Sequence, residues 1–389
     1  MRSKMKTKKI LFVATVVKTH INTFHIKNME YFKGLGYEVH VAAKNDFVPK
    51  NSLNIPNCDV YHDIDFPRNP FSTDMTKAYS QLKKVIDVEN FELIHCNTPV
   101  GGLLARIAAR QSRRNSGTKI LYQAHGFHFF KGAPLKNWML FYPVERLMAR
   151  DTDCLLVINQ EDFKRGKSFK CQQVQLVNGV GVEIDKSHNA SGNLREKYMI
   201  SKETKIICSI GELNKNKNHI TVIESLARIK AEVDKNFIYF ICGEGAQRRN
   251  IEEKVKELDL KDNVILLGYS NEVPKILADA DLFVFPSYRE GLPVSVMEAM
   301  SAGVPVVASN IRGNRDLIEN KVNGELFDLK NKEQLDDILK SFFNNSLPVK
   351  EYVSNSYMKI QDFETNKVLI QMSDIYDMLL GREEVKCKR

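Results

Sequence analysis

Two glutamates, Glu290 and Glu298, lie eight positions apart in the stretch DLFVFPSYREGLPVSVMEAMSAGVPVVAS, which spans residues 281–309. The first lies in a polar loop, and the second lies about one turn into a segment with helical spacing. Carboxylates repel phosphates but accept hydrogen bonds from hydroxyls. Glu298 is therefore expected to hold a cis-diol such as a ribose, and Glu290 a second polyol. Two ordinary surface glutamates fit the spacing equally well.

The segments around these glutamates predict a strand, a loop, a helix and a second strand. Leu282–Phe285 and Val304–Ala308 are apolar runs typical of buried parallel strands, and Val294–Ser301 has helical spacing ended by Gly303. In such α/β units, ligands bind outside the carboxyl ends of the strands. The unpaired N–H groups of a helix N-terminus there favour an anion. A phosphate beside two hydroxyl-binding carboxylates predicts a sugar nucleotide.

In this setting Glu290 and Glu298 resemble the E-x7-E pair of the retaining GT-B glycosyltransferases of family four, and EG…EAM.AG.PVVAS matches as well. The resemblance covers the second half of the chain closely and the first half loosely. It implies an α/β fold of two Rossmann-like, doubly wound parallel-sheet domains with an interdomain cleft. It also implies a donor site, whose residues in this sequence would be Gly211, Glu212, Lys217, Gly243, Glu290, Gly291, Leu292, Pro293, Val294 and Glu298.

The length of 389 residues favours two domains rather than one. A polar stretch after Val182 precedes a fresh series of strands and helices, so the sequence suggests domains at 1–190 and 191–360. Residues 361–389 would form a helical end that, by resemblance, crosses back to the first domain. Regular strand and helix patterns fill both halves; the expected strands include Ile10–Ala14, Glu38–Ala43, Leu93–Cys96, Lys119–Gln123, Cys154–Asn159, Lys205–Ile210, Phe237–Cys242 and Val264–Leu267.

Cysteine usage and hydropathy predict a cytoplasmic protein. The seven cysteines are scattered without C-x-x-C pairs, which favours buried thiols in a reducing compartment over disulfides or zinc. The apolar run Ile10–Val17 is too short for a signal peptide and reads as a first strand. No run of eighteen apolar residues predicts a membrane span. With the resemblance, the expected location is peripheral, on the inner face of the plasma membrane.

The positive charge is concentrated in the first 150 residues, which hold 23 Lys and Arg against 11 Asp and Glu, whereas the rest of the chain has a net charge of −3. A basic half suits an anionic partner such as nucleic acid, acidic lipid or a pyrophosphate-linked acceptor. A generally basic proteome also explains it. The resemblance favours a lipid-linked or oligosaccharide acceptor and an anionic membrane, and no nucleic acid.

The loop SIGELNKNKNH follows one predicted strand and contains Gly211 and Lys217. Lysine in such a loop neutralises a diphosphate or is simply solvated. The family has G-R-x-x-x-x-K here, so Lys217 matches its diphosphate lysine, whereas Glu212 stands where arginine is usual. Arg289 or Lys215 could supply the missing cation. Gly243 opens a strand-G-x-G turn, which is weak evidence by itself.

In the first half, His125 and the following glycine come at the carboxyl end of a predicted strand. A lone histidine is usually structural, but this one matches the family's H-G, where the residue faces the donor sugar. The loop TVVKTHINT lacks the glycine pair of many relatives. Its His20 either faces the acceptor or is an ordinary solvated or capping residue. Asn178 begins an N-G-V that either matches the family or is a simple turn.

Residues 128–147 combine Trp138 and other aromatic side chains with Lys131 and further cations. Such mixing fits an interfacial segment on acidic lipid, with its rings at headgroup depth. It fits an ordinary core helix equally well. Lipid-linked acceptors, which are frequent in the family, make membrane contact the more attractive interpretation.

Three D-x-D sequences, at 63–65, 151–153 and 279–281, could suggest a metal-bound nucleotide, but the last two lie directly before predicted strands, where aspartate commonly ends a helix or opens a turn. The resemblance implies an enzyme that needs no metal, so we expect no metal and no cofactor, with His125, Lys217 and Glu290 as catalytic residues. The expected reaction transfers a hexosyl group from a nucleotide-diphosphate sugar, with UDP as the commonest base, to an acceptor hydroxyl with retention. The alternatives are a sugar-nucleotide epimerase on the same fold and a catalytically silent membrane-docked scaffold.

Overall fold

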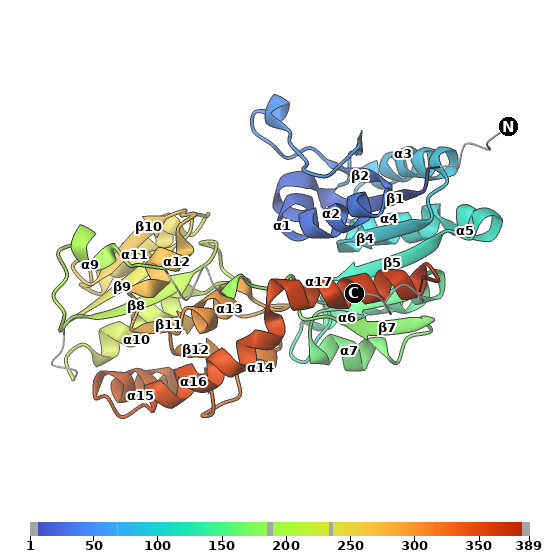
Figure 1. Ribbon diagram of the computed structural model, residues 1–389. Helices are drawn as coiled ribbons and strands as arrows, with labels where there is room; N and C mark the ends of the chain where they lie inside the picture. Colours follow the sequence, from blue (N-terminus) through green and yellow to red (C-terminus); the bar gives the residue numbers. More distant parts are fainter. Residues whose placement is uncertain (1–6, 68, 185–189, 233–235, 383–389) are drawn as a thin grey trace. The chain divides into compact units, whose positions relative to one another are not determined.

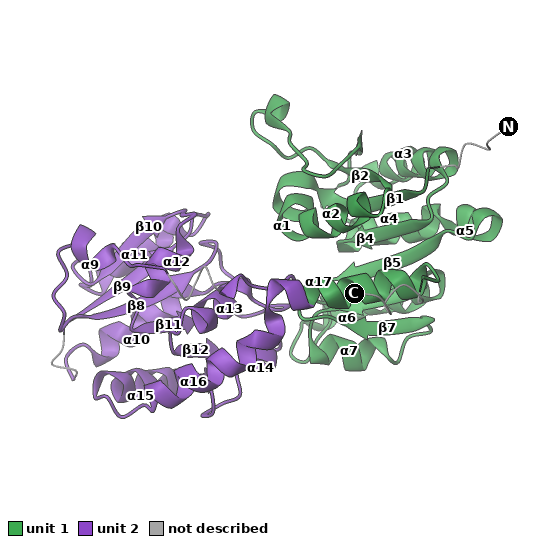
Figure 2. Cartoon of the chain, viewed as in Figure 1, with its two compact units in different colours: residues 1–179, 368–389 green, residues 180–367 purple. Residues whose placement is uncertain are grey.

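The computed structural model describes residues 7–67, 69–184, 190–232 and 236–382. The chain forms two compact units (Figure 2), of which unit 1 is Met1–Gly179 with Val368–Arg389 and unit 2 is Val180–Lys367. The chain therefore passes between units after Gly179 and after Lys367, whereas the sequence suggested boundaries at 190 and 360.

Unit 1 is built on a seven-stranded parallel sheet with the order β3-β2-β1-β4-β5-β6-β7 (Figure 1). Its strands are β1 Lys9–Val16, β2 Glu38–Lys44, β3 Val60–Asp63, β4 Leu93–Asn97, β5 Lys119–Ala124, β6 Cys154–Val157 and β7 Gln173–Leu176. β1 pairs with both β2 and β4, so the direction of winding reverses beside it. The carboxyl ends of β1 and β4 therefore flank a topological switch point, where doubly wound sheets bind ligands.

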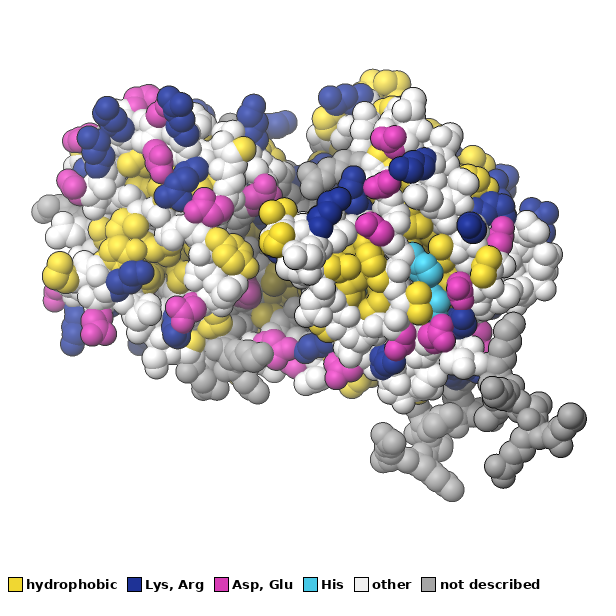
Figure 3. All heavy atoms as spheres, turned by 90° about the horizontal axis from the view of Figure 1, so that it is seen from above, with side chains coloured by type: hydrophobic (Ala, Val, Ile, Leu, Met, Phe, Trp, Pro, Cys, Tyr) yellow, Lys and Arg dark blue, Asp and Glu magenta, His cyan; other side chains and the backbone are white. Residues whose placement is uncertain are grey.

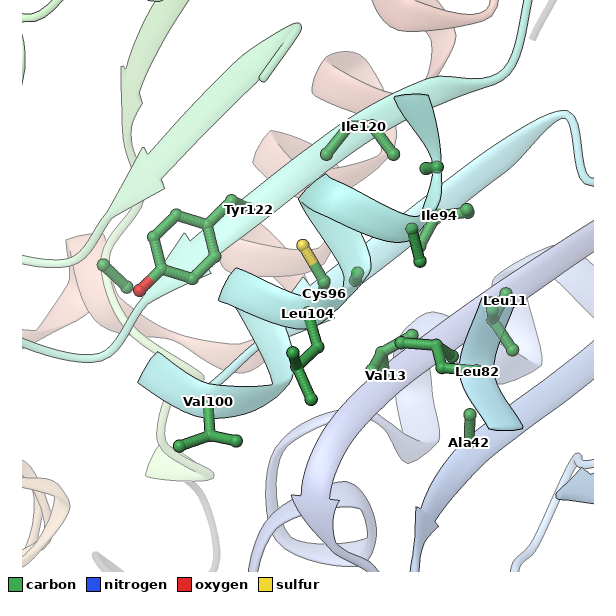
Figure 4. Packing of buried hydrophobic residues seen from close by; sticks show 14 of the residues in the cluster. Leu11, Val13, Ala42, Leu82, Ile94, Cys96, Val100, Leu104, Ile120 and Tyr122 are labelled. Atoms are coloured by element: carbon green, nitrogen blue, oxygen red, sulfur yellow. The ribbon is translucent and has the colours of Figure 1, made fainter. Parts of the chain in front are cut away.

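The helices of unit 1 cover this sheet. They are η1 Val17–Ile21, α1 Asn22–Phe24, α2 Ile26–Gly34, η2 Lys50–Ser52, α3 Asp74–Glu89, α4 Pro99–Ala108, α5 Arg110–Ser116, α6 Leu135–Met148, η3 Ala149–Asp151, α7 Gln160–Gly166 and most of α17 Thr365–Leu379. Figure 4 shows part of the core between helices and sheet, where Leu104 of α4 and Leu82 of α3 face side chains of β1 and β4.

A charged group, the Arg106 guanidinium, is buried in this core. The Arg106 guanidinium of α4 donates to Glu145 of α6 over 2.9 Å and stacks 3.9 Å from the ring centroid of Tyr122 on β5. The Tyr122 hydroxyl donates to the same carboxylate over 2.9 Å. A buried charge needs such partners, and these contacts fix which face of α6 turns toward the sheet.

Unit 2 repeats the architecture on a six-stranded parallel sheet with the order β10-β9-β8-β11-β12-β13. Its strands are β8 Lys205–Ile210, β9 Phe237–Cys242, β10 Val264–Gly268, β11 Leu282–Phe285, β12 Val306–Ser309 and β13 Glu325–Phe327. Its helices include α9 Leu194–Lys197, α10 His219–Ile229, α11 Arg248–Glu257, α12 Val273–Ala278, α13 Val294–Ser301, α14 Asn314–Leu317, α15 Lys332–Phe343, α16 Val349–Ile360 and η4 Gln361–Phe363. β8 lies between β9 and β11, so the switch point of unit 2 lies at the carboxyl ends of β8 and β11.

The sequence predicted two parallel α/β sheets, and the structure confirms them. It differs from the expected elements in two places. The spacing of apolar residues over 21–35 predicts one helix, whereas the structure has the π-helix η1 up to Ile21 and then α1 and α2 with a break at His25, whose φ is −124° and ψ −4°. The pattern over 352–380 predicts one helical region, whereas the structure has two helices, α16 and α17, separated by a 3-10 turn. Among the described residues, none of the helices combines the length and the apolar character that a membrane crossing requires.

Helix α17 joins unit 1 through a buried stripe that repeats every three or four residues: Val368, Met372, Ile375, Tyr376 and Leu379. The Tyr376 ring is fully buried, packs edge-on against Phe32 with ring centroids 4.7 Å apart, and places its hydroxyl 3.0 Å from His95 Nδ1. The neighbouring Tyr31 donates to Asp377 over 2.7 Å.

We expect Tyr376→Ala to lower the free energy of unfolding by about 3 to 5 kcal/mol, because it removes a buried aromatic ring and leaves a cavity. Ile370 lies on the same helix with 59% of its surface exposed, so Ile370→Ala is the matched control. Urea unfolding followed by circular dichroism measures both. Equal losses in the two variants would show that α17 does not depend on this stripe.

Candidate active site

The two loops that follow β8 and β11 are tied together at the switch point of unit 2. Asn216 Nδ2 donates to the carbonyl of Arg289 over 2.9 Å, and the Tyr288 N–H donates to the carbonyl of Asn216 over 2.8 Å. Asn218 Nδ2 donates to the carbonyl of Pro286 over 3.2 Å. Asn216 and Asn218 are not among the site residues predicted from the sequence. Asparagine in a strand-to-helix loop often bonds to nearby backbone groups. The residue type does not predict a partner about seventy residues away in the chain.

Two glycines allow the backbone segments around this site to approach closely. A Cβ at Gly243, whose φ is +150°, would lie 2.0 Å from the carbonyl oxygen of Gly211. A Cβ at Gly313, whose φ is +79°, would lie 2.6 Å from the carbonyl oxygen of Gly291. Glycine at both positions therefore lets the turns after β9 and β12 pack on the two loops. Arg312 supports the same loop, since its Nε donates to the carbonyl of Glu290 over 3.2 Å.

Lys217 and Glu290 form an ion pair between the two loops, with Nζ 2.8 Å from Oε1. Both side chains are mostly buried, at 18% and 14% exposure. The ammonium also lies 4.7 Å from the ring centroid of Phe285. The structure therefore brings together two residues that the sequence selected separately, and each one orients the other.

Glu298 has a different environment on α13. It is half-buried, and among the described residues its carboxylate has no hydrogen-bond or ion-pair partner. Burial raises the pKa of Glu298 from 4.5 to about 7. A desolvated carboxylate with free oxygens is suited to accept hydrogen bonds from the hydroxyls of a ligand.

The segment before α13 contains the remaining residues selected around Glu290. Gly291 adjoins the Gly313 turn, Leu292 is buried, Pro293 is the N-cap and Val294 is the first helical residue. The first N–H groups of a helix lack intrahelical partners and carry partial positive charge. This end of α13 therefore offers hydrogen-bond donors to an anion.

The family arginine is replaced by an exposed acid. Glu212 Oε2 accepts from Asn214 Nδ2 over 2.9 Å and makes no ion pair among the described residues. Lys215 and Arg289, the two candidates for a compensating cation, are both exposed. Neither forms an ion pair within the described part of the chain, so both charges remain available to a ligand.

In unit 1, His125 follows β5 and lies among other aromatic rings. Its Nε2 is 3.4 Å from Asn97 Oδ1 at the end of β4, and its ring centroid is 4.8 Å from that of His20. Burial lowers the pKa of His125 to about 4, so the imidazole is neutral at neutral pH. His20, which the sequence placed toward either an acceptor or solvent, is 9% exposed within this cluster.

The segment at 128–147 contributes to the core with its aromatic rings and to the surface with its aliphatic side chains. Trp138 packs against the core cluster, with the Arg165 guanidinium 4.5 Å from its ring centroid. Phe129 is fully buried. Lys131 is exposed, as are Leu135 and Met139 on α6, at 72% and 66%. The core interpretation therefore holds for these rings.

The aspartates of the D-x-D sequences have protein partners. Asp151 and Asp153 pair with Arg110 and Arg113 over 2.7 and 2.9 Å. Asp281 pairs with Arg195 over 2.9 Å. These ion pairs give the aspartates of the second and third sequences a structural role.

The two doubly wound sheets, each with polar groups at its switch point, define the GT-B class. Residues 9–159 match the family described as glycosyl transferase 4-like, and residues 191–359 match glycosyl transferases group 1. The structure of Anabaena HepE in complex with UDP and glucose has a TM-score of 0.77 at 19% identity, covering 95% of this chain and 100% of that chain.

Two relatives match over most of their length. The putative glycosyltransferase EpsD of Bacillus subtilis is 37% identical over 383 residues, covering 97% of this chain and 98% of the relative. A UDP-Gal:α-D-GlcNAc-diphosphoundecaprenol α-1,3-galactosyltransferase of Escherichia coli is 27% identical over 325 residues, covering 79% and 80%. The chain belongs to the family 4 glycosyltransferases, a family of retaining hexosyltransferases, and it is an enzyme.

The environment of Glu298 predicts a pH effect on stability. The pKa of Glu298 is about 7 in the folded protein and 4.5 for a free side chain, as in the unfolded chain. Between these pH values the folded state therefore binds a proton that the unfolded state does not. Stability therefore falls as pH rises through this window, by about 3 kcal/mol in total. As the pH rises from 4.5 to 8, we expect the free energy of unfolding of wild type to fall by this amount relative to that of Glu298→Gln, which has no carboxyl group to titrate. Urea unfolding measures both. The exposed Glu333→Gln serves as control, and a difference that does not change with pH would contradict the burial argument.

Proposed function

We propose that this enzyme transfers a hexosyl group from a UDP-sugar to a hydroxyl of a lipid-linked glycan during surface polysaccharide synthesis. The observation that carries the proposal is that α13, which follows β11, holds a desolvated Glu298 carboxylate, while the loops after β8 and β11 hold the Lys217–Glu290 pair. The names of two similar proteins support the chemistry, since one is a UDP-Gal-dependent transferase acting on a diphosphoundecaprenol and another binds UDP and glucose.

In this proposal each residue of unit 2 has a distinct task. Glu298 accepts hydrogen bonds from the ribose hydroxyls, and Glu290 accepts them from the hexose. Lys217 exchanges part of its contact with Glu290 for the donor diphosphate, which the N–H groups after Gly291 also bind. The role of His125 toward the donor sugar rests on the H-G match.

The chemical difficulty is the departure of the diphosphate. The bond between the anomeric carbon and the diphosphate oxygen breaks with its electron pair on that oxygen, and an acceptor oxygen bonds to the same face of the sugar. Lys217 and the helix N–H groups stabilise the developing negative charge because they are held in place before reaction. The acceptor proton passes to the departing phosphate oxygen, so the site needs no protein base, and attack on the same face needs no protein nucleophile.

Release of nucleoside diphosphate tests the proposal. We expect one donor from a panel of UDP-, GDP- and ADP-hexoses to turn over only when membrane extract supplies the acceptor. Glu298→Ala should lower the rate by about 10- to 100-fold, because a hydrogen bond to a charged group contributes roughly 1.5 to 3 kcal/mol. Glu333→Ala, an exposed glutamate of α15, should retain wild-type rates.

Other products would identify other functions. Conversion of the sugar nucleotide to its isomer without acceptor would indicate an epimerase. Absence of both turnover and nucleotide binding would contradict the donor site as a whole. Full activity of Glu298→Ala would contradict only the assignment of the ribose to this residue.

We further propose that α6 rests on an anionic membrane. Leu135, Met139 and Leu147 are 72%, 66% and 54% exposed and recur every four or eight residues, which places them on one stripe of the helix. Lys136 and Arg146 are exposed beside it, and the only acid of α6, Glu145, is buried against Arg106. An apolar stripe flanked by cations alone fits acidic lipid.

We expect the double change Leu135→Glu with Met139→Glu to weaken binding to phosphatidylglycerol vesicles by about tenfold or more, since each apolar side chain contributes roughly 1 kcal/mol on partial burial. Co-sedimentation measures the bound fraction. Val88→Glu on α3, at 65% exposure, is the control. If the control loses as much binding as the double variant, α6 is not the contact surface.

A further inference from the structure

Three histidines of unit 1 converge from two distant parts of the chain. His20 lies in η1, His25 lies at the break between α1 and α2, and His125 follows β5. Each offers a ring nitrogen, and these three nitrogens lie within 4.8 Å of one another. The ring centroids are 4.8 Å apart for His20 and His125, and 5.5 Å apart for His20 and His25.

Two of these buried imidazoles lack hydrogen bonds that buried polar groups normally make. His25 is fully buried and His20 is 9% exposed, yet among the described residues His20 Nε2 and both ring nitrogens of His25 have no partner in good hydrogen-bond geometry, although the Asn97 side chain interacts with His25. An unsatisfied buried polar atom costs about 1 to 3 kcal/mol. The adjacent His95 shows the ordinary solution, since its ring nitrogens lie 3.0 Å from Gln123 Oε1 and 3.0 Å from the Tyr376 hydroxyl.

The backbone is irregular at the point that brings His20 and His25 together. In a regular α-helix, residues five positions apart point about 140° away from each other. Here η1 is a π-helix and His25 breaks the helix that follows, so both rings face His125. Single π-turns occur frequently at functional sites.

We propose that His20, His25 and His125 bind one divalent transition metal ion of the zinc type. Three imidazoles without a carboxylate or thiolate suit Zn²⁺, Ni²⁺ or Cu²⁺ rather than Mg²⁺ or Ca²⁺. Small rotations of the rings would bring one nitrogen from each histidine to bonding distance, and they would give the unsatisfied nitrogens a partner. The fourth coordination position belongs to water.

A second group with suitable ligand types, Glu38, His40 and Glu89, differs because a cation of the chain already occupies it. Lys9 Nζ lies 2.6 Å from Glu89 and 3.1 Å from Glu38, and His40 Nε2 lies 2.7 Å from Glu38. His40 Nδ1 also contacts His62 Nε2 over 2.9 Å. His62 is therefore a matched histidine outside the proposed site.

A metal ion at this site takes up the lone pair of the His125 nitrogen that coordinates it, so this nitrogen can no longer accept a hydrogen bond. If His125 contacts the donor sugar, as proposed above, the ion inhibits transfer. This consequence rests on the proposed function, whereas metal binding does not.

The test is calorimetric titration of Zn²⁺ into the untagged, full-length chain without substrate. We expect one equivalent to bind, and His20→Gln and His25→Gln to weaken binding at least tenfold while His62→Gln does not. Circular dichroism establishes that each variant is folded, and His20→Gln provides a second readout if His25→Gln unfolds. On the face that Figure 3 shows, histidine side chains cover only a small area.

Visible absorption of the Co²⁺ form gives an independent readout. A three-histidine site produces d–d bands without the thiolate charge-transfer bands that cysteine ligands would add. Absence of one-to-one binding, equal weakening by His62→Gln, or thiolate bands would each overturn the proposal. Loss of transferase activity in the histidine variants, with Zn²⁺ affinity unchanged, would leave the proposed function standing and refute the metal site.

Discussion

The ion pair between Lys217 and Glu290 links the two strands on which the candidate site depends. β8 and β11 are neighbours in the sheet although about seventy residues separate them, so the loops after them meet only because the sheet places their carboxyl ends side by side. The ion pair and the hydrogen bonds of Asn216 and Asn218 then hold these loops in one arrangement. Because the pair is mostly buried, separating it without a replacement partner would be costly. In the proposed reaction, the diphosphate of the donor would be that replacement for Lys217.

The same stretch of chain gives its two glutamates opposite environments. Glu290 has a cation within 2.8 Å, whereas Glu298 is desolvated on α13 without one, and burial raises the pKa of Glu298 to about 7. The two carboxylates are chemically identical, but their surroundings give them different interactions. The paired carboxylate is oriented before a ligand arrives, and the unpaired one gains most from a ligand that donates hydrogen bonds. This difference supports separate tasks for the two residues in the proposed reaction.

The sequence predicted the elements of unit 2 better than the contacts between them. The bounds of β8, β9, β11 and α13 agree with the expected ranges, because continuous apolar runs ended by glycine or proline mark buried strands and helix ends. Contacts such as Arg312 with Glu290 depend on strand order, which no local pattern contains. The sequence does not predict the helix break at His25, because VKTHINTFH contains no glycine or proline, the residues that usually mark a helix end. The rings of α6 were ambiguous because aromatic residues suit both a core and a membrane interface.

The replacement of the family arginine by Glu212 changes the charge balance around the proposed leaving group. The Lys217 ammonium is already paired with Glu290. Glu212 adds a second carboxylate, which accepts a hydrogen bond from Asn214. Since exposed charges are screened by solvent, the remote cations Lys215 and Arg289 compensate only weakly until a ligand draws them in. In the proposed mechanism the N–H groups at the start of α13 therefore carry more of the diphosphate charge than they would beside an arginine. Their positions are fixed by the helix and by Gly313, whose close approach to Gly291 holds that segment in place, so this stabilisation needs no reorganisation when the charge develops.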